Sequence, residues 1–373
     1  MRWHLNRMWR PFFLSAILFL MSACAAPAQV KSGSYIQDVQ LSPEGDMVAF
    51  QFCNRKVKRC GIGLFDVRTE TLTRIPSPPG TDLGHPSFSY DGKKLAASLF
   101  CQENCTAEEK TTSHIVVIDI ETLSMTQVTQ GSGLPVKRGR AGIRKYPVFQ
   151  PGIDNILFVT QAVYPGGGIF QYGLALVDMK DGTETILIDP ADGFRLAIFR
   201  PSFVGADEIR FTAMSPIAAE LRATVKTTYK DHENMPLPYQ HRFGETPEII
   251  SPYPELKQGP LMDIKIAELE PVSSHNGKRT VFTYQSSIIP TEIGKGFNYE
   301  IYLHENGKTK QVTDLRAYMS FIAISHKGRY VMFGMDNTRG MNFEFYILDL
   351  DTGRATSTGL RDLVANDPAL TLE

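Results

Sequence analysis

Ser42-Pro43-Glu44-Gly45, followed by the apolar run Met47–Phe50, is the first copy of a short pattern that this chain repeats six times. Each copy is a tight turn that contains glycine, followed by a run of apolar or small residues. The later copies begin at Ser89, Gln150, Phe203, Ser274 and Ser325. Successive turn glycines are roughly 50–70 residues apart, a period typical of a radial repeat rather than of one globular sheet.

Five of the six copies continue with two further strand-like runs. A second stretch with period-2 alternation of Val, Ile and Tyr ends near an acidic or turn residue, and a polar turn then leads to a run rich in Thr and Val. This alternation predicts half-buried antiparallel strands. Glycine after the second run, as in Asp181-Gly182 and Asn306-Gly307, supplies the positive φ that a hairpin needs. The stretches are residues 62–75, 114–129, 174–188, 299–313 and 343–358.

One repeat is therefore four strands, A to D, which form one blade of a β-propeller. The sequence predicts an all-β fold: a six-bladed propeller of four-stranded antiparallel blades over residues 35–361, with a C-terminal tail at 362–373 outside the blades.

The repeat resembles the TolB-type (WD-like) β-propeller family. The resemblance rests on the S-x-x-G turn with its apolar run, on strands that end in Asp such as the one at Phe65-Asp66, and on Leu-Thr-like ends. It covers about residues 35–360 and implies the fold but little about function, because such propellers serve both as scaffolds and as enzyme domains. The α/β domain that precedes the propeller of TolB has no counterpart here, so the role of TolB is not carried over. Relatives of prolyl oligopeptidase need a hydrolase domain, and no G-x-S-x-G motif is present.

Blade four and the closure of the ring are the weakest parts of the pattern. Blade four is recognisable only at Arg200–Met214, and a long insert is expected at about 215–260. Its third and fourth strands are expected within the insert, in Arg222–Lys230 and Pro247–Ile250; the alternative is a distorted blade. Residues Ser34–Gln40 either open blade one or complete the last blade.

The N-terminal residues form a signal sequence over residues 1–23, with Arg2, Arg7 and Arg10 before an apolar stretch too short to remain as a membrane helix. Met21-Ser22-Ala23-Cys24 resembles the lipobox of bacterial lipoproteins, which implies lipidation of Cys24, a short tether at 24–34 and, with Ala25 next, sorting to the outer membrane. The alternative is an ordinary cleaved signal, for which Ala26-Pro27-Ala28 offers a site. Either reading predicts export to the periplasm.

The charge of the exported chain is about −4, because removing residues 1–23 removes three arginines and no acidic residue. Nucleic-acid-binding domains are strongly basic, so nucleic acid is not the expected partner. The motifs of calcium loops and phosphate-binding glycine loops are absent from the sequence, and no cofactor is expected.

Besides Cys24 there are four cysteines, two in each of two loops. Four cysteines allow three pairings. Pairing within each loop is favoured, since each pair flanks one hairpin and an exported chain meets an oxidising compartment. A zinc site is the alternative, but no histidine has metal-ligand spacing around them. The predicted disulfides are Cys53–Cys60 and Cys101–Cys105.

Strand order assigns the loops to two faces. In a four-stranded meander the A–B and C–D turns lie on one face, and the B–C and D–A loops lie on the other. The first set is short and regular, whereas the second carries both cysteine pairs, the insert and two basic clusters.

Because variable loops on a rigid scaffold carry binding residues, this second face is the predicted binding surface, for an anionic partner such as lipid headgroups, lipopolysaccharide or an acidic protein. The alternative is that these loops are tolerated insertions. The basic residues are Lys56, Lys58 and Arg59 in one cluster and Lys137, Arg138, Arg140, Arg144 and Lys145 in the other.

No residue is predicted to be catalytic. The eight histidines form no H-E-x-x-H or other recognised pattern, although His85 is placed to face the central channel.

The leading hypothesis is a monomeric, lipid-anchored propeller that binds an envelope protein or an anionic envelope component without catalysis. The alternative is an enzyme like a polysaccharide lyase, acting on an acidic glycan at the mouth of the channel. Basic residues turned inward around a deep pocket with His85 would favour the enzyme, and outward ones a binding surface.

Overall fold

The computed structural model describes residues 34–54, 56–137, 139–163, 171–216, 236–249, 271–291, 294–336 and 343–366. All of them lie in one compact unit, Ser32–Glu373. The predicted signal at 1–23, Cys24, the tether and Arg138 lie outside these residues. Within the described residues, no helix has the length and apolar character needed to cross a membrane.

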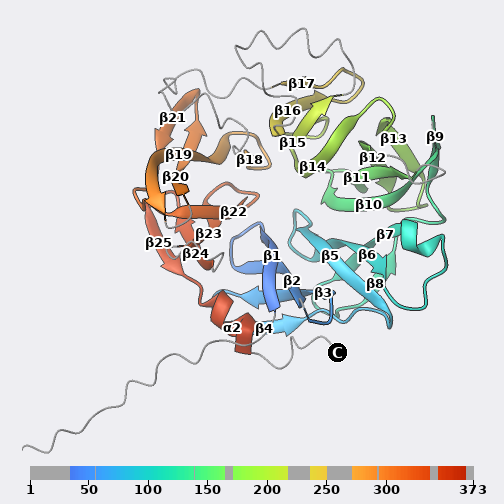
Figure 1. Cartoon of the computed structure of the whole chain (residues 1–373), viewed down its shortest axis with the longest axis horizontal. Helices are drawn as coiled ribbons and strands as arrows, with labels where there is room; N and C mark the ends of the chain where they lie inside the picture. Colours follow the sequence, from blue (N-terminus) through green and yellow to red (C-terminus); the bar gives the residue numbers. More distant parts are fainter. Residues whose placement is uncertain are drawn as a thin grey trace, which may run out of the picture. The chain divides into compact units, whose positions relative to one another are not determined.

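The described strands form a six-bladed β-propeller, as the repeat predicts (Figure 1). Each blade is an antiparallel meander whose first strand faces the centre of the ring. Blades one to three contain β1 (Ser34–Leu41), β2 (Met47–Asn54), β3 (Arg59–Asp66) and β4 (Thr71–Arg74); β5 (Thr81–Phe88), β6 (Lys94–Cys101), β7 (Ser113–Asp119) and β8 (Met125–Gln127), with the 3₁₀ helix η1 (Glu109–Thr111); and β10 (Gly139–Phe149), β11 (Asn155–Val163), β12 (Tyr172–Asp178) and β13 (Glu184–Ile188), with β9 (Leu134–Val136) paired to β10.

The other three blades continue around the ring in chain order. They contain β14 (Phe194–Phe203), β15 (Glu208–Pro216), β16 (Pro236–Arg242) and β17 (Glu248–Ile249); β18 (Val272–Ser273), β19 (Arg279–Thr291), β20 (Gly294–Glu305) and β21 (Lys308–Gln311); and β22 (Tyr318–Ile324), β23 (Tyr330–Asp336), β24 (Glu344–Asp349) and β25 (Arg354–Ser357).

Blade four is complete, and its third strand differs from the prediction. Strand β16 at Pro236–Arg242 pairs with β15 along its whole length, so the third strand lies after the expected segment 222–230, which is outside the described residues. Strand β17 at Glu248–Ile249 falls where the fourth strand is expected. Part of the expected insert therefore belongs to the blade, and Tyr239 of β16 is fully buried in its core.

The serine of the repeated turn explains why the pattern recurs. In four blades this serine accepts a hydrogen bond at Oγ from the backbone N–H five residues later, at 2.9–3.1 Å, which fixes the start of the second strand. The turn glycine donates its N–H to the carbonyl of the same serine and adopts a positive φ, such as 76° at Gly45, which L-residues with a side chain rarely adopt. These serines are Ser42, Ser89, Ser274 and Ser325.

The ring closes by apolar packing. Strand β1 pairs with β2 as the first strand of blade one, and β22–β25 complete blade six, so within the described residues no strand is shared between the chain ends. A core cluster joins β1 and β2 to β23 and β24, and the C-terminal helix α2 (Leu360–Asn366) adds Leu360 and Val364 to it. The predicted boundary at residue 361 thus falls inside a helix that holds blades one and six together.

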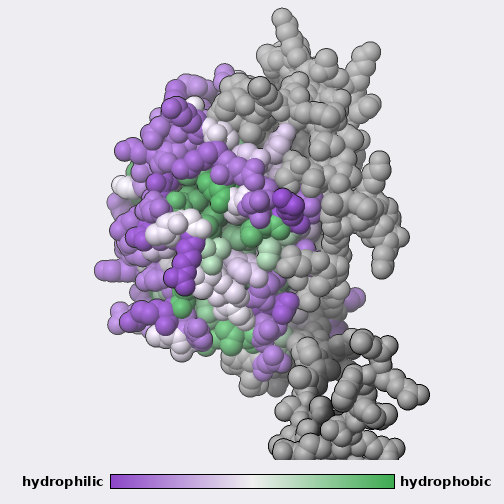
Figure 2. All heavy atoms as spheres, turned by 90° about the vertical axis from the view of Figure 1, so that its left-hand side faces the viewer, coloured by the Kyte–Doolittle hydropathy of each residue, from purple (hydrophilic) through white to green (hydrophobic). Residues whose placement is uncertain are grey.

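On the side of the molecule formed by blades five and six, hydrophilic residues surround a central area of apolar ones (Figure 2). The outermost strand β25 is exposed at every position and carries Arg354, and β21 carries Lys308 and Lys310. Charged and polar side chains on an edge strand discourage pairing with another chain. The described edge strands β21 and β25 therefore do not present an apolar edge.

We expect Leu360→Ala to destabilise the protein by about 2–5 kcal/mol, because Leu360 is fully buried in the closing cluster. Leu315→Ala is the matched control: Leu315 is 38% exposed, and its replacement should change stability by less than about 0.5 kcal/mol. Urea unfolding followed by circular dichroism measures both. Equal effects would contradict closure by this helix.

Candidate functional site

The face that carries the A–B and C–D turns, the turn face, is held together by contacts between neighbouring A–B turns. Among the described residues, the turns of blades one and two have no polar link to each other and meet through Pro43, which a Cβ at Gly92 would contact at 3.4 Å. The polar links run around the rest of the ring, and each joins one blade to the next. They are Tyr90 Oη to the Phe149 carbonyl (2.9 Å), Gln150 Nε2 to the Ala206 carbonyl (2.7 Å), Gly205 N to the His275 carbonyl (3.2 Å), His275 N to the His326 carbonyl (3.0 Å), and the ion pair of Lys327 with Glu44.

Tyr90 also reaches across the channel from blade two to blades five and six. Its ring centroid lies 4.0 Å from that of His275 and 4.6 Å from that of His326. At these separations no water molecule fits between the rings. Burial raises the pKa of Tyr90 and lowers the pKa of His275, so both groups stay neutral near pH 7. The three rings narrow the channel at the turn face.

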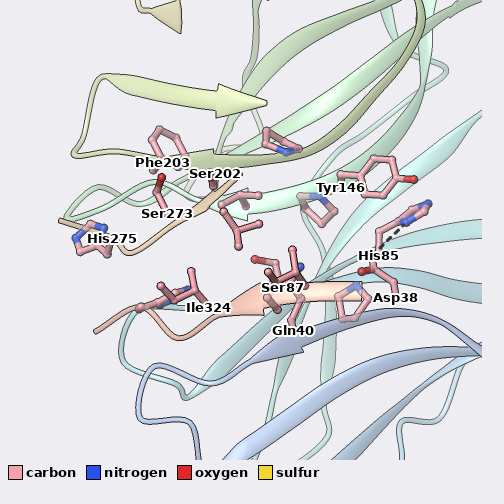
Figure 3. A pocket seen from close by; sticks show the side chains of 18 of the residues that line it. Asp38, Gln40, His85, Ser87, Tyr146, Ser202, Phe203, Ser273, His275 and Ile324 are labelled. Atoms are coloured by element: carbon pink, nitrogen blue, oxygen red, sulfur yellow. Dashed lines mark ion pairs between the residues drawn. The ribbon is translucent and has the colours of Figure 1, made fainter. Parts of the chain in front are cut away.

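A cavity of about 70 Å³ lies along the channel (Figure 3). A volume of this size holds a few water molecules and is too small for a sugar ring. His275 lines one end, and His85, Asp38 and Tyr146 line the other, while Ser87, Ser202 and Ser273 place hydroxyl groups between them. The side chains of this set come from the first strands or the A–B turns of five blades.

Asp38, His85 and Tyr146 occupy the same position in three blades, four residues before the first residue of the turn. The His85 and Tyr146 rings are in contact, with their centroids 3.9 Å apart and their planes tilted by 43°, and His85 Nδ1 lies 3.8 Å from a carboxylate oxygen of the buried Asp38. Sequence analysis found His85 but missed the other two. An alignment of the repeats on their turn residues would have found all three.

His85 and Tyr146 also share a strained backbone. Their φ angles are 53° and 50°, and each lies at a β-bulge where the first and second strands of its blade shift register. A positive φ in a residue with a bulky side chain costs about 1–3 kcal/mol and is found preferentially at functional sites. The His85 N–H donates to Gln51 Oε1 of blade one at 3.0 Å, which holds the bulge in place.

The first predicted disulfide pair is confirmed, and it closes the loop between β2 and β3. Cys53 and Cys60 are bonded, and both lie on the face of the B–C and D–A loops, the loop face. Arg59 donates to Asp82 Oδ1 at 2.6 Å and to the Thr81 carbonyl at 2.9 Å, and it pairs with Glu103. Its charge is therefore neutralised within the protein.

Lys56 and Lys58 of the same loop are exposed, and within the described residues neither side chain has a hydrogen-bond or ion-pair partner. Lys58 adopts the left-handed conformation at φ 54°, which turns the chain back toward Cys60. Of the first predicted cluster, these two residues carry charges that are available to a partner.

The second predicted disulfide pair is confirmed as well. Cys101 and Cys105 close a short exposed loop after β6. The backbone N–H groups of Gln102 and Glu103 both donate to the Gly80 carbonyl, at 2.8 and 3.1 Å. The ion pair of Glu103 with Arg59 then connects the two disulfide loops.

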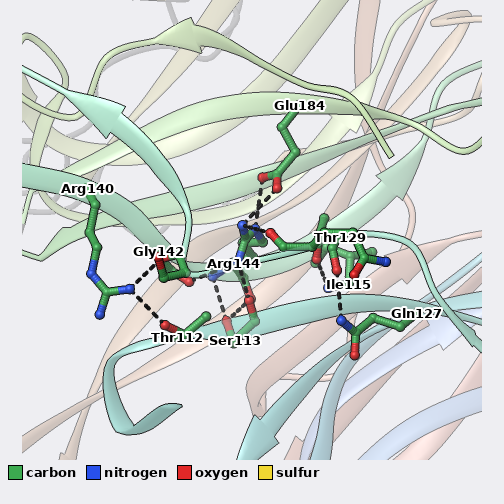
Figure 4. Close-up of polar contacts among 11 residues, drawn as sticks. Thr112, Ser113, Ile115, Gln127, Thr129, Arg140, Gly142, Arg144 and Glu184 are labelled. Carbon is green, nitrogen blue, oxygen red and sulfur yellow. Dashed lines mark hydrogen bonds and ion pairs between the residues drawn. The ribbon is translucent and has the colours of Figure 1, made fainter. Parts of the chain in front are cut away.

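The second basic cluster is largely part of the fold (Figure 4). Arg144 is fully buried between blades two and three, where its guanidinium makes two hydrogen bonds to Glu184 at 2.8 and 2.9 Å and donates to the Ser113 carbonyl at 2.7 Å. Arg140 donates to Thr111, Thr112 and the Ser132 carbonyl. These two arginines fasten strands and loops to each other.

The lysines of this cluster differ from each other. Lys137 is exposed and forms an ion pair with Asp192. Lys145 is partly buried, and burial lowers its pKa because the charged form is disfavoured there. The structure therefore does not bring the predicted basic residues together as one patch.

The comparisons with known proteins support the fold. No protein-family model and no curated protein sequence matches the chain. Among solved structures, the tricorn protease matches with a TM-score of 0.51 and 16% identity, over 87% of this chain and 26% of that chain. TolB from Acinetobacter baumannii matches with a TM-score of 0.49 and 16% identity, over 87% and 63%. An oligogalacturonate lyase in complex with manganese matches with a TM-score of 0.49 and 11% identity, over 88% and 78%.

At these identities the similarity shows a β-propeller and no activity. The chain spans less than two thirds of TolB and about a quarter of the tricorn protease.

We expect Arg144→Met to destabilise the protein by about 3–5 kcal/mol, because it leaves the Glu184 carboxylate, which is 6% exposed, without its cation. Adding Glu184→Gln should recover part of the loss. Lys137→Met is the control: the exposed pair with Asp192 should contribute less than about 1 kcal/mol. Urea unfolding measures all three, and a small effect of Arg144→Met would show that Arg144 is not structural.

We also expect stability to fall as the pH drops from 6.5 toward 4. Burial, and secondarily the neighbouring His275, lower the pKa of His326 to about 4, whereas an unfolded histidine titrates near 6.5. The unfolded chain therefore binds the extra proton in this window, and the loss is at most of order 3 kcal/mol. His326→Gln should show a shallower decline in urea unfolding between these pH values. An unchanged decline would mean that His326 does not cause it.

Proposed function

We propose that this chain is an exported β-propeller, anchored by a lipid on Cys24, that binds an envelope partner through its loop face without catalysing a reaction. The observation that carries the proposal is the difference between the two faces. On the turn face, the polar groups of the A–B turns bond to the neighbouring turns and three rings narrow the channel. On the loop face, the disulfide-closed loop between Cys53 and Cys60 presents Lys56 and Lys58, which are exposed and have no partner among the described residues.

The mouth of the channel supports the same choice of face. His85 and Tyr146, whose backbones are strained and whose rings are in contact, lie at the opposite end of the cavity from His275. Strain of this kind persists where the surroundings hold it and where recognition benefits from a preformed shape. A partner that covers the loop face would meet these side chains at its centre and the disulfide loops at the periphery.

The lyase-like alternative has one observation in its favour, the contact of His85 with the buried Asp38. Such a pair can orient an imidazole for proton transfer. The predicted basic residues do not surround it, however: Arg144 and Arg140 are engaged between blades, and Lys56 and Lys58 extend from a loop. Among the described residues, no three His, Cys, Asp or Glu side chains come together as metal ligands. The binding module is therefore the better supported proposal.

Site-specific photo-cross-linking in intact envelopes tests the proposal. A photoreactive residue replaces Ala107, exposed on the loop face, or Lys278, exposed on the turn face. We expect a cross-linked partner from position 107 and none from position 278, and the wild-type chain in the membrane fraction, with Cys24→Ala released. Adducts from position 278 alone would contradict the choice of face. Release of an unsaturated product from an acidic polysaccharide by the purified chain, lost in His85→Ala, would favour the enzyme.

A further inference from the structure

We propose that the disulfide-closed loop between Cys53 and Cys60 docks onto the headgroups of an anionic phospholipid surface. The inference rests on the export proposed above and names a partner for the loop face. The segment reads Cys53-Asn-Arg-Lys-Val-Lys-Arg-Cys60, with four cationic residues and no acidic one. Basic residues near a bilayer that contains anionic lipid are each attracted to its surface potential.

The charges at the tip of the loop are available to such a surface. Arg59 is paired with Asp82 and Glu103, which holds the base of the loop against blade two. Lys56 and Lys58 extend into solvent with no partner among the described residues. The structural role and the binding role are thus divided between residues of the same short segment.

An apolar side chain lies between the two lysines. Val57 is 44% exposed, and it is one of few large hydrophobic residues that the described part of the chain exposes to this degree. Cations that flank an exposed apolar residue match the chemistry of the membrane interface, where the apolar group enters the headgroup region and the cations meet phosphate. An acidic protein surface would use the lysines but would leave Val57 without an obvious role.

The loop presents these residues in a fixed shape. Asn54 Oδ1 accepts hydrogen bonds from the N–H groups of Lys56 and Val57, at 2.9 and 3.4 Å, and the disulfide closes the loop below them. Less conformational freedom is therefore lost on docking.

Two of the three acidic residues in the neighbouring loop are paired with arginines. Glu103 is paired with Arg59, and Glu108 lies 3.7 Å from Arg140. Glu109 accepts a hydrogen bond from the Thr106 N–H, and its pKa is lowered mainly by this bond, so it stays ionised near pH 7. Among the described residues, no carboxylate forms an ion pair with Lys56 or Lys58.

The start of the described chain lies at the base of this loop. Asn54 Nδ2 donates to Ser34 Oγ at 3.2 Å, and Ser34 pairs with Asn54 across β1 and β2. Cys24 is ten positions earlier in the sequence, a distance of at most about 35 Å along an extended chain. A lipid on Cys24 would therefore keep the loop within reach of the same bilayer.

Vesicle binding tests the proposal. The chain from Ala25 onward, which lacks the signal and the lipid site and keeps the compact unit Ser32–Glu373, is mixed with vesicles of phosphatidylcholine alone or with 30% phosphatidylglycerol. We expect binding to the anionic vesicles only, weakened by salt. Lys56→Glu with Lys58→Glu should weaken it at least about 25-fold, since each cation near such a surface contributes about fivefold. Val57→Ser should weaken it several-fold.

The matched control is Lys308→Glu with Lys310→Glu, which makes the same change of charge on the exposed outer strand β21. It should bind like the parent chain. Equal weakening by both pairs, or equal binding to both kinds of vesicle, would overturn the proposal. No vesicle binding, together with a cross-linked acidic protein that is lost in the Lys56/Lys58 variant, would assign the loop to a protein partner instead. If no vesicle binding is found but position 107 still gives a cross-linked partner, the lipid surface is the wrong partner and the loop face remains the proposed binding face.

Discussion

The hydrogen bonds between neighbouring A–B turns are the constraint on which the rest of the propeller depends. In four blades the turn is shaped by its own serine and glycine, and at five of the six junctions a polar link joins a turn to the next blade, from Tyr90 to Phe149 and onward to the ion pair of Lys327 with Glu44. A change in the length of a turn would break at least one of these links. The repeat is therefore regular on this face because the ring requires it, and variation is confined to the other face.

Buried polar contacts also join neighbouring blades nearer the loop face. Arg144 connects blade two to blade three, and Arg59 connects the two disulfide loops. A buried or half-buried cation of this kind is satisfied by fixed acceptors and is not available to a partner. A sequence therefore contains more basic residues than the surface can offer to a partner. Among the described basic residues of the two clusters, only Lys56 and Lys58 are both exposed and without a partner.

Much of the fold could be predicted from the sequence, because the turn and the alternating strands are local patterns that repeat. The blade count, the strand order and both disulfides follow from them. The third strand of blade four could not be placed, since Pro236-Leu-Pro-Tyr239 does not read as a strand by itself and is fixed by its pairing with β15. The partners of Arg144 could not be predicted either, because Ser113 and Glu184 lie 31 and 40 residues away from it in the sequence.

The candidate site could be predicted only in part. Asp38, His85 and Tyr146 share one position of the repeat, so their convergence on the channel is implicit in the alignment of the blades. Their chemistry is not, because the bulges that give His85 and Tyr146 a positive φ depend on the register of each strand pair. The repeat places this position on the first strand of the blade and leaves it free to differ there: the side chain changes from blade to blade, and Asp38, unlike His85 and Tyr146, does not adopt a positive φ. Asymmetry in the channel arises from that freedom, and a symmetric scaffold can thereby present a single, specific surface at its loop face.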